Sequence, residues 1–194
     1  METKNIFKTR KTNQMKRFAK WFTIGVVVMV TGVYFFSLQA FAEIKSDTYS
    51  YIQHKYSDKF VCTGSKDDGG NVHIWGPIPT GHLDRYMFKF ITIPGEDYYY
   101  VVHKYSGKYI CTGDKNNGAQ IHLWGYIPPG QENRYKFKPI PIGGGYYYLL
   151  HKESDKFVCT GSTTNGDNIY TWGPIPDDHY DRYKFKITPL FIKK

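Results

Sequence analysis

Cysteine is scarce in this chain of 194 residues, which contains three. A small, odd number does not make the dense disulfide framework that stabilises small exported domains. The chain also lacks a Ser/His/Asp order, a paired-carboxylate motif and a strong metal-ligand spacing, and no stretch after residue 42 shows sustained helical periodicity. These absences argue against an enzyme and against a helical protein, and we predict neither a metal site nor a cofactor.

The first 42 residues differ in composition from the rest. They begin with a basic segment, continue with the apolar run "WFTIGVVVMVTGVYFFSL" at residues 21–38, and end with Ala40 and Ala42 in the small-x-small arrangement that signal peptidase accepts. We therefore predict that residues 1–42 are a secretory signal peptide, cleaved after Ala42. The apolar run approaches the length of a membrane span, which leaves an uncleaved signal anchor as the alternative. In both cases residues 43–194 lie outside the cytoplasm, because the basic end stays inside.

The basic character of the chain belongs mainly to this leader. The net charge is +9 overall, but residues 43–194 hold 19 Lys and Arg against 16 Asp and Glu, which is +3. Binding to nucleic-acid phosphates needs a concentrated basic face. We therefore predict no nucleic-acid partner, and contact with a membrane only through the N-terminal segment if that segment stays uncleaved.

The rest of the chain consists of one sequence unit used three times. The phrase "VHIWGPIP" at residues 72–79 recurs as "IHLWGYIPP" at 121–129 and "IYTWGPIP" at 169–176. Other positions recur at the same steps of 49 and then 48 residues: His54, His103 and His151; Cys62, Cys111 and Cys159; Trp75, Trp124 and Trp172; Arg85, Arg134 and Arg182. A fixed period of this size indicates a repeated supersecondary unit, with repeats over about 47–95, 96–143 and 144–194.

Each unit is predicted to contain four short strands. In the second repeat, "YYYVVHK", "KYICTG", "AQIHLWG" and "RYKFKPI" are rich in aromatic and β-branched residues, and turn residues separate them. Three such units predict a twelve-stranded all-β domain over residues 43–194. A β-propeller usually has at least four blades, so a barrel of threefold symmetry capped by hairpins is the better prediction.

The period, the repeat number and the strand order resemble the β-trefoil of the ricin B-chain-like lectins. The segment "YYYVVHKYSGKYICTG" is similar to the opening of that family's repeat, and "RYKFKP" is similar to its closing strand. The resemblance covers residues 47–194. It implies an exported β-trefoil that binds carbohydrate, with glycans or glycoconjugates as its partners.

Two sugar-binding motifs of that family are altered in this chain. The family has an Asp that accepts hydrogen bonds from sugar hydroxyls, whereas this chain has Cys62, Cys111 and Cys159 at that position. A thiol is a weak acceptor and does not replace a carboxylate that binds two hydroxyls. The family's Gln-x-Trp signature is also replaced, by Asp-Arg-Tyr or Asn-Arg-Tyr. The resemblance therefore does not extend to galactose specificity.

The repeated Trp phrase is the main candidate for binding. In "VHIW", Val72 and Ile74 alternate with His73 and Trp75, so the aliphatic pair should face the core and the other pair the opposite side of the strand. In the lectins an aromatic residue near this point stacks under the apolar face of the sugar. Buried packing residues of three hairpins are the other interpretation, and both stay open. The candidates are Trp75, Trp124, Trp172, His73, His122 and Tyr170.

A polar loop precedes each Trp phrase, with the sequences "GSKDDGGN", "GDKNNGAQ" and "GSTTNGDN". Amides and short acids suit sugar hydroxyls, and they also suit tight turns. The second repeat has the fullest set of hydrogen-bonding groups, so we expect its site to be the best formed. The candidate carbohydrate-binding residues of these loops are Asn71, Gln120, Asn168, Asp114, Asn116 and Asn117.

The three cysteines fall on different repeats, so threefold symmetry would place them too far apart for a disulfide. Each is expected near the residue that lies two before the Trp, as Cys62 near His73. A Cys/His pair is half of a metal site or an activated nucleophile, but the third repeat has Tyr170 instead of His. We predict buried, unreactive thiols and structural roles for the three repeated histidines.

These patterns predict a secreted β-trefoil lectin with up to three related weak sites, which would bind a dense glycan surface by avidity. The alternative is a protein-binding β-trefoil, such as an inhibitor or a toxin accessory domain, whose lobes are scaffold. The exposure of the three Trp side chains distinguishes the two. A lectin should expose them partly beside the polar loops, and a scaffold should bury them.

Overall fold

The structure is a computed structural model that describes residues 44–190, and the predicted leader at 1–42 lies outside the described residues. We call residues 47–95, 96–143 and 144–190 lobes 1, 2 and 3. Lobe 1 contains β1 (Tyr49–His54), β2 (Phe60–Cys62), β3 (His73–Trp75), the 3-10 helix η1 (Leu83–Tyr86) and β4 (Met87–Thr92). Lobe 2 contains β5 (Tyr99–His103), β6 (Tyr109–Cys111), β7 (Ala119–Gln120), β8 (His122–Trp124), η2 (Glu132–Tyr135) and β9 (Lys136–Gly143). Lobe 3 contains β10 (Tyr146–His151), β11 (Lys156–Cys159), β12 (Tyr170–Trp172), η3 (Tyr180–Tyr183) and β13 (Phe185–Pro189).

Four strands per lobe match the prediction, and lobe 2 has one more, the two-residue β7. This strand pairs with β12 of lobe 3 through Gln120 and Tyr170. At the equivalent places the other lobes make isolated bridges, Asn71 to His122 and His73 to Asn168. The predicted twelve strands therefore become thirteen because one of these three contacts between lobes is longer than the others. Over residues 44–190, no helix has the length and apolar character needed to cross a membrane.

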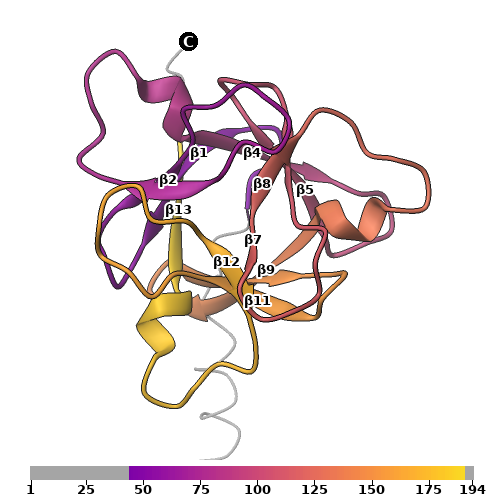
Figure 1. The fold of residues 1–194 in the computed structure, drawn as a ribbon. Helices are drawn as coiled ribbons and strands as arrows, with labels where there is room; N and C mark the ends of the chain where they lie inside the picture. Colours follow the sequence, from indigo (N-terminus) through magenta and orange to yellow (C-terminus); the bar gives the residue numbers. More distant parts are fainter. Residues whose placement is uncertain (1–43, 191–194) are drawn as a thin grey trace, which may run out of the picture. The chain divides into compact units, whose positions relative to one another are not determined.

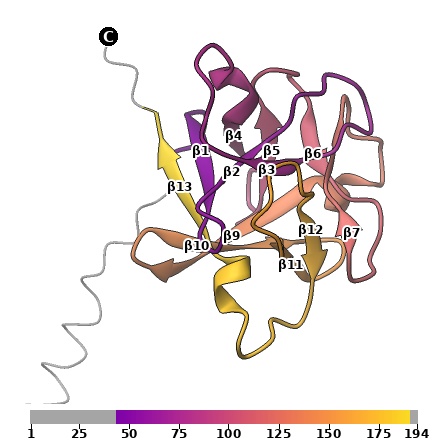
Figure 2. The ribbon, with the colours of Figure 1, turned by 60° about the vertical axis from the view of Figure 1, so that its left-hand side comes forward.

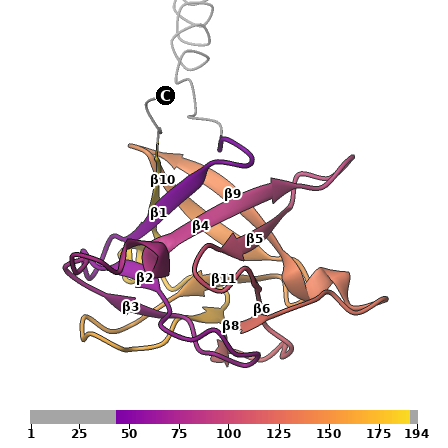
Figure 3. The ribbon, with the colours of Figure 1, turned by 90° about the horizontal axis from the view of Figure 1, so that it is seen from above.

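Six strands form a closed barrel. Strand β1 pairs with β13 and with β4, β4 with β5, β5 with β9, β9 with β10, and β10 with β13, all antiparallel. Closure leaves none of these six strands as a free edge. Figure 3 shows β1, β4, β9 and β10 toward one end of the domain and the shorter β2, β3, β6 and β8 toward the other.

Three hairpins cap the barrel with the same register. In β2–β3, β6–β8 and β11–β12 the residues opposite each other include Phe60 and Trp75, Tyr109 and Trp124, and Phe157 and Trp172. Figure 1 shows the lobes around a common centre with the three 3-10 helices at the periphery. One backbone hydrogen bond joins each pair of lobes in a cycle. The N–H of Val72 donates to the carbonyl of Ile121 (3.0 Å), the N–H of Ile121 to the carbonyl of Ile169 (3.0 Å), and the N–H of Ile169 to the carbonyl of Val72 (3.1 Å). A six-stranded barrel with a three-hairpin cap is the β-trefoil fold.

The core lies between barrel and cap, and the strand alternation builds it. In β1 every second residue is buried, and Phe88, Phe137 and Phe185 from the last strand of each lobe are 0 to 1% exposed. Val72 and Ile74 are fully buried while His73 and Trp75 face away, which confirms the predicted alternation. Figure 2 shows the cap strands β3, β6 and β12 on the side of the domain away from β13.

The three repeated histidines are buried and join neighbouring lobes, which confirms their structural role. His103 accepts a hydrogen bond from Ser106 at Nδ1 (3.0 Å), and its Nε2–H donates to the main-chain carbonyl of Arg85 (3.1 Å). A carbonyl only accepts, so the proton must sit on Nε2. His54 and His151 make the same contacts to the carbonyls of Arg182 and Arg134. Burial lowers the pKa of each of the three imidazoles to about 4.

Candidate functional site

The Trp side chains lie at the ends of the cap hairpins and are not core residues. Trp75 is 40% exposed and Trp172 is 39% exposed, and Trp124 is half-buried. Each indole meets the half-buried ring two residues before it edge to face, with centroids 6.2 to 6.3 Å apart. The three hairpins therefore present partly exposed indoles, which is the arrangement expected of binding platforms.

The polar loop beside each Trp comes from a neighbouring lobe and not from its own. The side-chain amide of Asn165 in lobe 3 makes two hydrogen bonds to Gly76. Its oxygen accepts from the N–H of Gly76 and its NH₂ donates to the carbonyl of Gly76, at 3.1 Å each. Asn117 of lobe 2 holds Gly173 in the same way. Asp68 of lobe 1 accepts from the N–H of Gly125 at 2.7 Å. Each of these glycines directly follows a Trp, so every loop fixes the hairpin end of another lobe.

Glycines of these loops lie against the exposed indoles. A methyl group at Gly166 would lie 3.6 Å from the ring of Trp75, and one at Gly118 would lie 3.9 Å from the ring of Trp172. Both glycines have a φ near +90°, in the left-handed region that other residues rarely adopt. The neighbouring lobe therefore supports one side of the Trp75 ring and one side of the Trp172 ring, which restricts how these two rings can turn.

The hydrogen-bonding set predicted for the second repeat does not assemble around Trp124. Asp114 accepts from both the backbone and the side chain of Asn116, at 2.9 and 2.8 Å, which forms a local turn. Asn117 is engaged with Gly173 in lobe 3. The side chains of Asp114, Asn116 and Asn117 therefore make turn and lobe contacts, and the carbohydrate-binding role expected of lobe 2 stays a prediction. Of the loop-end amides, Asn71 and Gln120 are exposed and Asn168 is half-buried.

Equivalent pockets lie beside Trp75 in lobe 1 and Trp172 in lobe 3, with volumes of ≈ 240 and ≈ 220 Å³. Each takes residues from the end of the second strand, from the Trp strand, from the following loop and from the 3-10 helix. The lobe 1 pocket is lined by Cys62, Thr63, Gly64, His73, Trp75, Pro79, His82, Arg85 and Tyr86. The lobe 3 pocket is lined by Cys159, Thr160, Gly161, Tyr170, Trp172, Pro176, His179, Arg182 and Tyr183.

At the position where the ricin B-like lectins have a carboxylate, these two pockets have a thiol, Cys62 in lobe 1 and Cys159 in lobe 3. Burial raises the pKa of the Cys62 thiol to about 12, against a smaller lowering by its hydrogen bond with Tyr86. Burial and the neighbouring thiol raise the pKa of Tyr86 to about 12. Cys62 lies opposite His73 in the hairpin, as predicted. Cys62, Cys111 and Cys159 are all buried and free, and a protonated thiol is a poor nucleophile and metal ligand.

Sequence reasoning missed the residues of the opposite wall, Arg85 and His82 in lobe 1 and their equivalents in lobe 3. The carbonyl of Arg85 accepts from the N–H of Thr63 at 3.1 Å and from His103, which fixes the backbone at this wall. The side chain of Arg85 packs over Tyr105, with the guanidinium carbon 5.1 Å from the ring centroid. The recurrence of Arg at 85, 134 and 182 was the signal available in the sequence.

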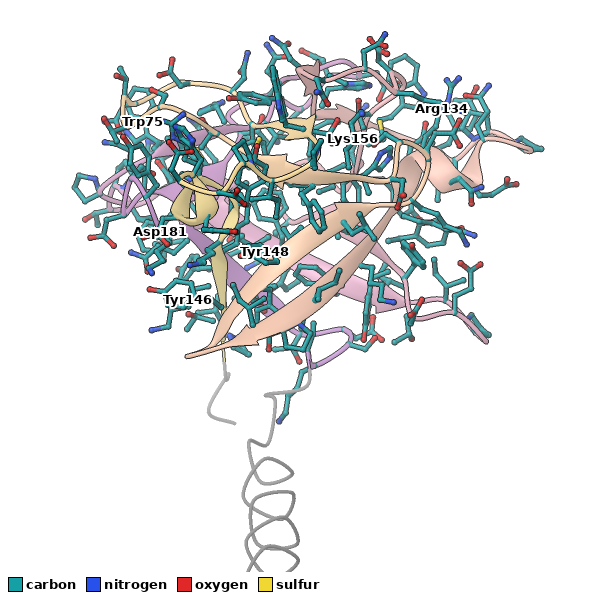
Figure 4. All side chains as sticks on the ribbon, turned by 90° about the horizontal axis from the view of Figure 1, so that it is seen from below. Trp75, Arg134, Tyr146, Tyr148, Lys156 and Asp181 are labelled. Carbon is teal, nitrogen blue, oxygen red and sulfur yellow. The ribbon has the colours of Figure 1, made fainter. Side chains whose placement is uncertain are left out.

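Lobe 2 departs from the other two at this wall. Gln131 stands where lobes 1 and 3 have His82 and His179, and its Oε1 accepts from Nη1 of Arg134 at 3.0 Å. Tyr126, 62% exposed, stands where the other lobes have a Pro after the Trp-Gly pair. Figure 4 shows Trp75 and Arg134 on opposite sides of the domain, so the sites of lobes 1 and 2 are separate.

Comparison with known proteins supports the fold. No family model and no curated protein matches the sequence. Among solved structures, the designed three-fold symmetric protein ThreeFoil is 23% identical, with a TM-score of 0.64 over 74% of this chain and 100% of its own. The BEL β-trefoil is 15% identical, with a TM-score of 0.60 over 77% and 99%. The Polyporus squamosus lectin, solved with a glycan ending in Neu5Ac, is 16% identical, with a TM-score of 0.59 over 75% and 50%. These likenesses establish a β-trefoil.

Proposed function

We propose that this protein is an exported carbohydrate-binding protein of the ricin B-like type, which binds glycans at the pockets beside Trp75 and Trp172. The observation that carries the proposal is the equivalence of the two pockets. Two sites in different lobes pair an indole that is about two-fifths exposed with the same kinds of neighbours. Residues needed only for packing would not have to leave the same side chain exposed at both places.

The dimensions of the pockets support a sugar ring as the ligand. At ≈ 240 and ≈ 220 Å³ they are smaller than the roughly 300–1,000 Å³ of pockets that take drug-sized molecules. A pocket of this size suits one ring at the end of a glycan. An exposed indole offers a flat apolar surface to the C–H face of a sugar, and stacking of this kind contributes about 0.5–1.5 kcal/mol beyond area burial.

We propose binding without catalysis. The residues that would be considered first as catalytic groups, the buried histidines and cysteines, are held in structural contacts. His54, His103 and His151 use both ring nitrogens in hydrogen bonds within the fold. The thiols stay protonated at neutral pH because burial raises their pKa to about 12.

We also propose that the domain is exported and that two of its lobes bind glycan. The predicted signal peptide at 1–42 would deliver the domain outside the cytoplasm, where glycoconjugates are exposed on surfaces. Two pockets on one rigid domain would bind a glycan-covered surface by avidity even when each site is weak. The solved structures of similar fold include the Polyporus squamosus lectin, which was solved with a bound glycan, and this supports glycan binding as the proposed function.

A glycan array with the purified protein, three Trp variants and one control variant tests this function. Trp75→Ala and Trp172→Ala should each weaken binding, and the double variant should abolish it, while the melting temperature changes little because both indoles are partly exposed. Phe88→Ala is the matched control for loss of an aromatic core residue, since Phe88 is fully buried. It should lower stability by about 3–5 kcal/mol. Array binding that survives the double Trp variant would contradict the proposal.

Protein recognition remains the second candidate, because large apolar side chains are exposed outside the pockets. Leu83 is 46% exposed, Tyr126 is 62% exposed and Tyr180 is 44% exposed. If the partner is a protein, Tyr126→Ala should weaken its binding and free glycan should not displace it. If the partner is a glycan, Tyr126→Ala should leave binding unchanged and free glycan should compete.

A further inference from the structure

The pockets of lobes 1 and 3 each contain an arginine whose charge is paired with no acid among the described residues. Among residues 44–190, neither Arg85 nor Arg182 forms an ion pair. The acids next to them in sequence are paired with lysines: Asp84 with Lys104 at 2.8 Å, and Asp181 with Lys55 and Lys184 at 3.1 and 2.9 Å. In addition, the Nε of Arg85 is buried and finds no hydrogen-bond partner within the described residues.

The pocket of lobe 1 combines this free cation with a shortage of acceptors. Its lining includes no carboxylate. The protonated thiol of Cys62 stands at the position where the ricin B-like lectins have the Asp that binds sugar hydroxyls. Thr63 Oγ1 already accepts from the N–H of Ser65 at 3.2 Å. A neutral sugar would therefore find few acceptors for its hydroxyl protons, whereas a negatively charged group would find a guanidinium with unused donors.

The guanidinium of Arg85 is also held in place before any ligand arrives. Its group lies over the ring of Tyr105, and the Nζ of Lys66 lies 4.2 Å from the centroid of the same ring. Its backbone is fixed by Thr63 and His103, and Nη1 lies close to Gly64, where a methyl group would be 3.6 Å away. A planar, restrained guanidinium suits two parallel hydrogen bonds to a carboxylate, sulfate or phosphate.

We propose that lobe 1 binds a negatively charged sugar, one that carries a carboxylate, sulfate or phosphate group, with Arg85 binding the anion while Trp75 stacks on the ring. This rests on the proposed function and adds the ligand class. His82 belongs to the same wall and adds a second hydrogen-bonding group. The chemistry shared by the three kinds of anion is a set of oxygen acceptors matched to the guanidinium fork.

The other two lobes are weaker versions of this site, for reasons visible in their neighbours. In lobe 3, Asp178 lies 2.5 Å from Nδ1 of His179, whereas lobe 1 has Gly81 at the equivalent position. The acid adds negative charge beside the wall that would receive the anion. In lobe 2, Nη1 of Arg134 already donates a hydrogen bond to Oε1 of Gln131, so it is less available to an anion. The order of affinity for an anionic sugar is therefore lobe 1, then lobe 3, then lobe 2.

The first test compares matched glycans on the unaltered protein. The probes are lactose, 3′-sulfated lactose and 3′-sialylated lactose, measured by calorimetry at low and at physiological salt. The charged forms should bind at least about tenfold more tightly than lactose, since a hydrogen bond to a charged group is worth more than a neutral one. Added salt should reduce that advantage. Equal binding of lactose and its charged forms, or array binding confined to neutral glycans, would overturn the anionic inference and leave glycan binding intact. Binding of none of these probes and of no glycan on the array would reject the proposed function itself.

Free anions and two variants identify the site. Inorganic sulfate or phosphate alone should not compete at concentrations near that of the sulfated sugar, and effective competition would mean a site for free anions and would overturn the sugar assignment. Arg85→Gln should remove the charged-sugar advantage, while Lys138→Gln, which deletes a charge outside the pocket, should keep it. Arg85→Lys retains charge without the fork and should lose part of the advantage, so it replaces Arg85→Gln if that variant does not fold. An unchanged advantage in the Arg85 variant used would refute the role of Arg85.

Discussion

Lowering the pH from 7.5 to 5 is expected to destabilise the domain by about 6 kcal/mol, because three buried histidines must then take up protons on unfolding. His54, His103 and His151 are each fully buried, and burial lowers each pKa from 6.5 to about 4. In the unfolded chain they titrate near 6.5, so between pH 6.5 and 4 the unfolded state binds more protons than the folded one. Stability is therefore fully present above pH 6.5 and is lost as the pH falls.

The magnitude follows from the shift of each group. One pKa unit corresponds to about 1.4 kcal/mol, which gives about 2 kcal/mol for each histidine at pH 5. Half-buried His73 and His122, whose pKa values burial also lowers, add to the slope in the same direction. The ion-paired carboxylates behave separately. Asp68 and Glu96, for example, have pKa values held below 3.8 and 4.5 by lysine partners, so their contribution is lost only at lower pH.

Urea unfolding followed by Trp fluorescence at pH 7.5, 6.5, 5.5 and 5 measures this dependence. The free energy of unfolding should fall by at least about 4 kcal/mol per pH unit in the steep part, which is the slope for three protons, and His73 and His122 steepen it further. His103→Gln should reduce the slope by about 1.4 kcal/mol per pH unit, whatever it does to stability at pH 7.5. A free energy of unfolding that stays constant between pH 6.5 and 5 would refute the reasoning.

Four further outcomes are expected. Asn165→Ala should lower stability by about 1–2 kcal/mol and shift Trp fluorescence, since it removes both hydrogen bonds to Gly76; Asn116→Ala, which removes a turn contact, is the control for a loop change. Thiol titration should find Cys62, Cys111 and Cys159 unreactive in the folded protein and all three reactive after unfolding without reductant, and two missing thiols in a monomer would contradict this. N-terminal sequencing of the exported protein should begin at residue 43, whereas a membrane-bound product that retains residues 1–42 would favour the anchor. Trp124→Ala should leave glycan binding almost unchanged whereas Trp75→Ala weakens it, because Trp124 is less exposed and Gln131 accepts a hydrogen bond from the arginine beside it; an equal loss would contradict the ranking of the lobes.

Local patterns predicted most of the fold. The alternation that buries Val72 and Ile74 and turns out Trp75 is a property of any strand, so the local sequence suffices to predict it. The repeat period predicted that three units share one structure, and the common register of the three hairpins confirms this. The extra strand β7 depended on how Ala119 and Gln120 meet lobe 3, which no local pattern contains.

The candidate site was predictable only in part. The Trp lies on a strand of the repeated phrase, whereas the arginine follows in a separate 3-10 helix whose position depends on the folded structure. The repeated phrase indicated the Trp wall. No local pattern placed Arg85 opposite this wall, since Arg85 reaches the pocket only after η1 folds back toward the end of β2. Asn117 was expected to bind sugar hydroxyls, whereas both groups of its amide are hydrogen-bonded to Gly173.

The sequence by itself determined that this is a threefold repeated all-β chain, which residues of each strand are buried, and which aromatic side chain each hairpin presents. These features depend on neighbours a few residues apart, and the repeat makes the same local choice three times. Only the tertiary structure decided which loop supports which indole and which arginine is left without an acid. Those pairings join residues such as Asn165 and Gly76, which are 89 positions apart, and they arise when the cyclic bonds among Val72, Ile121 and Ile169 close the three lobes around one axis.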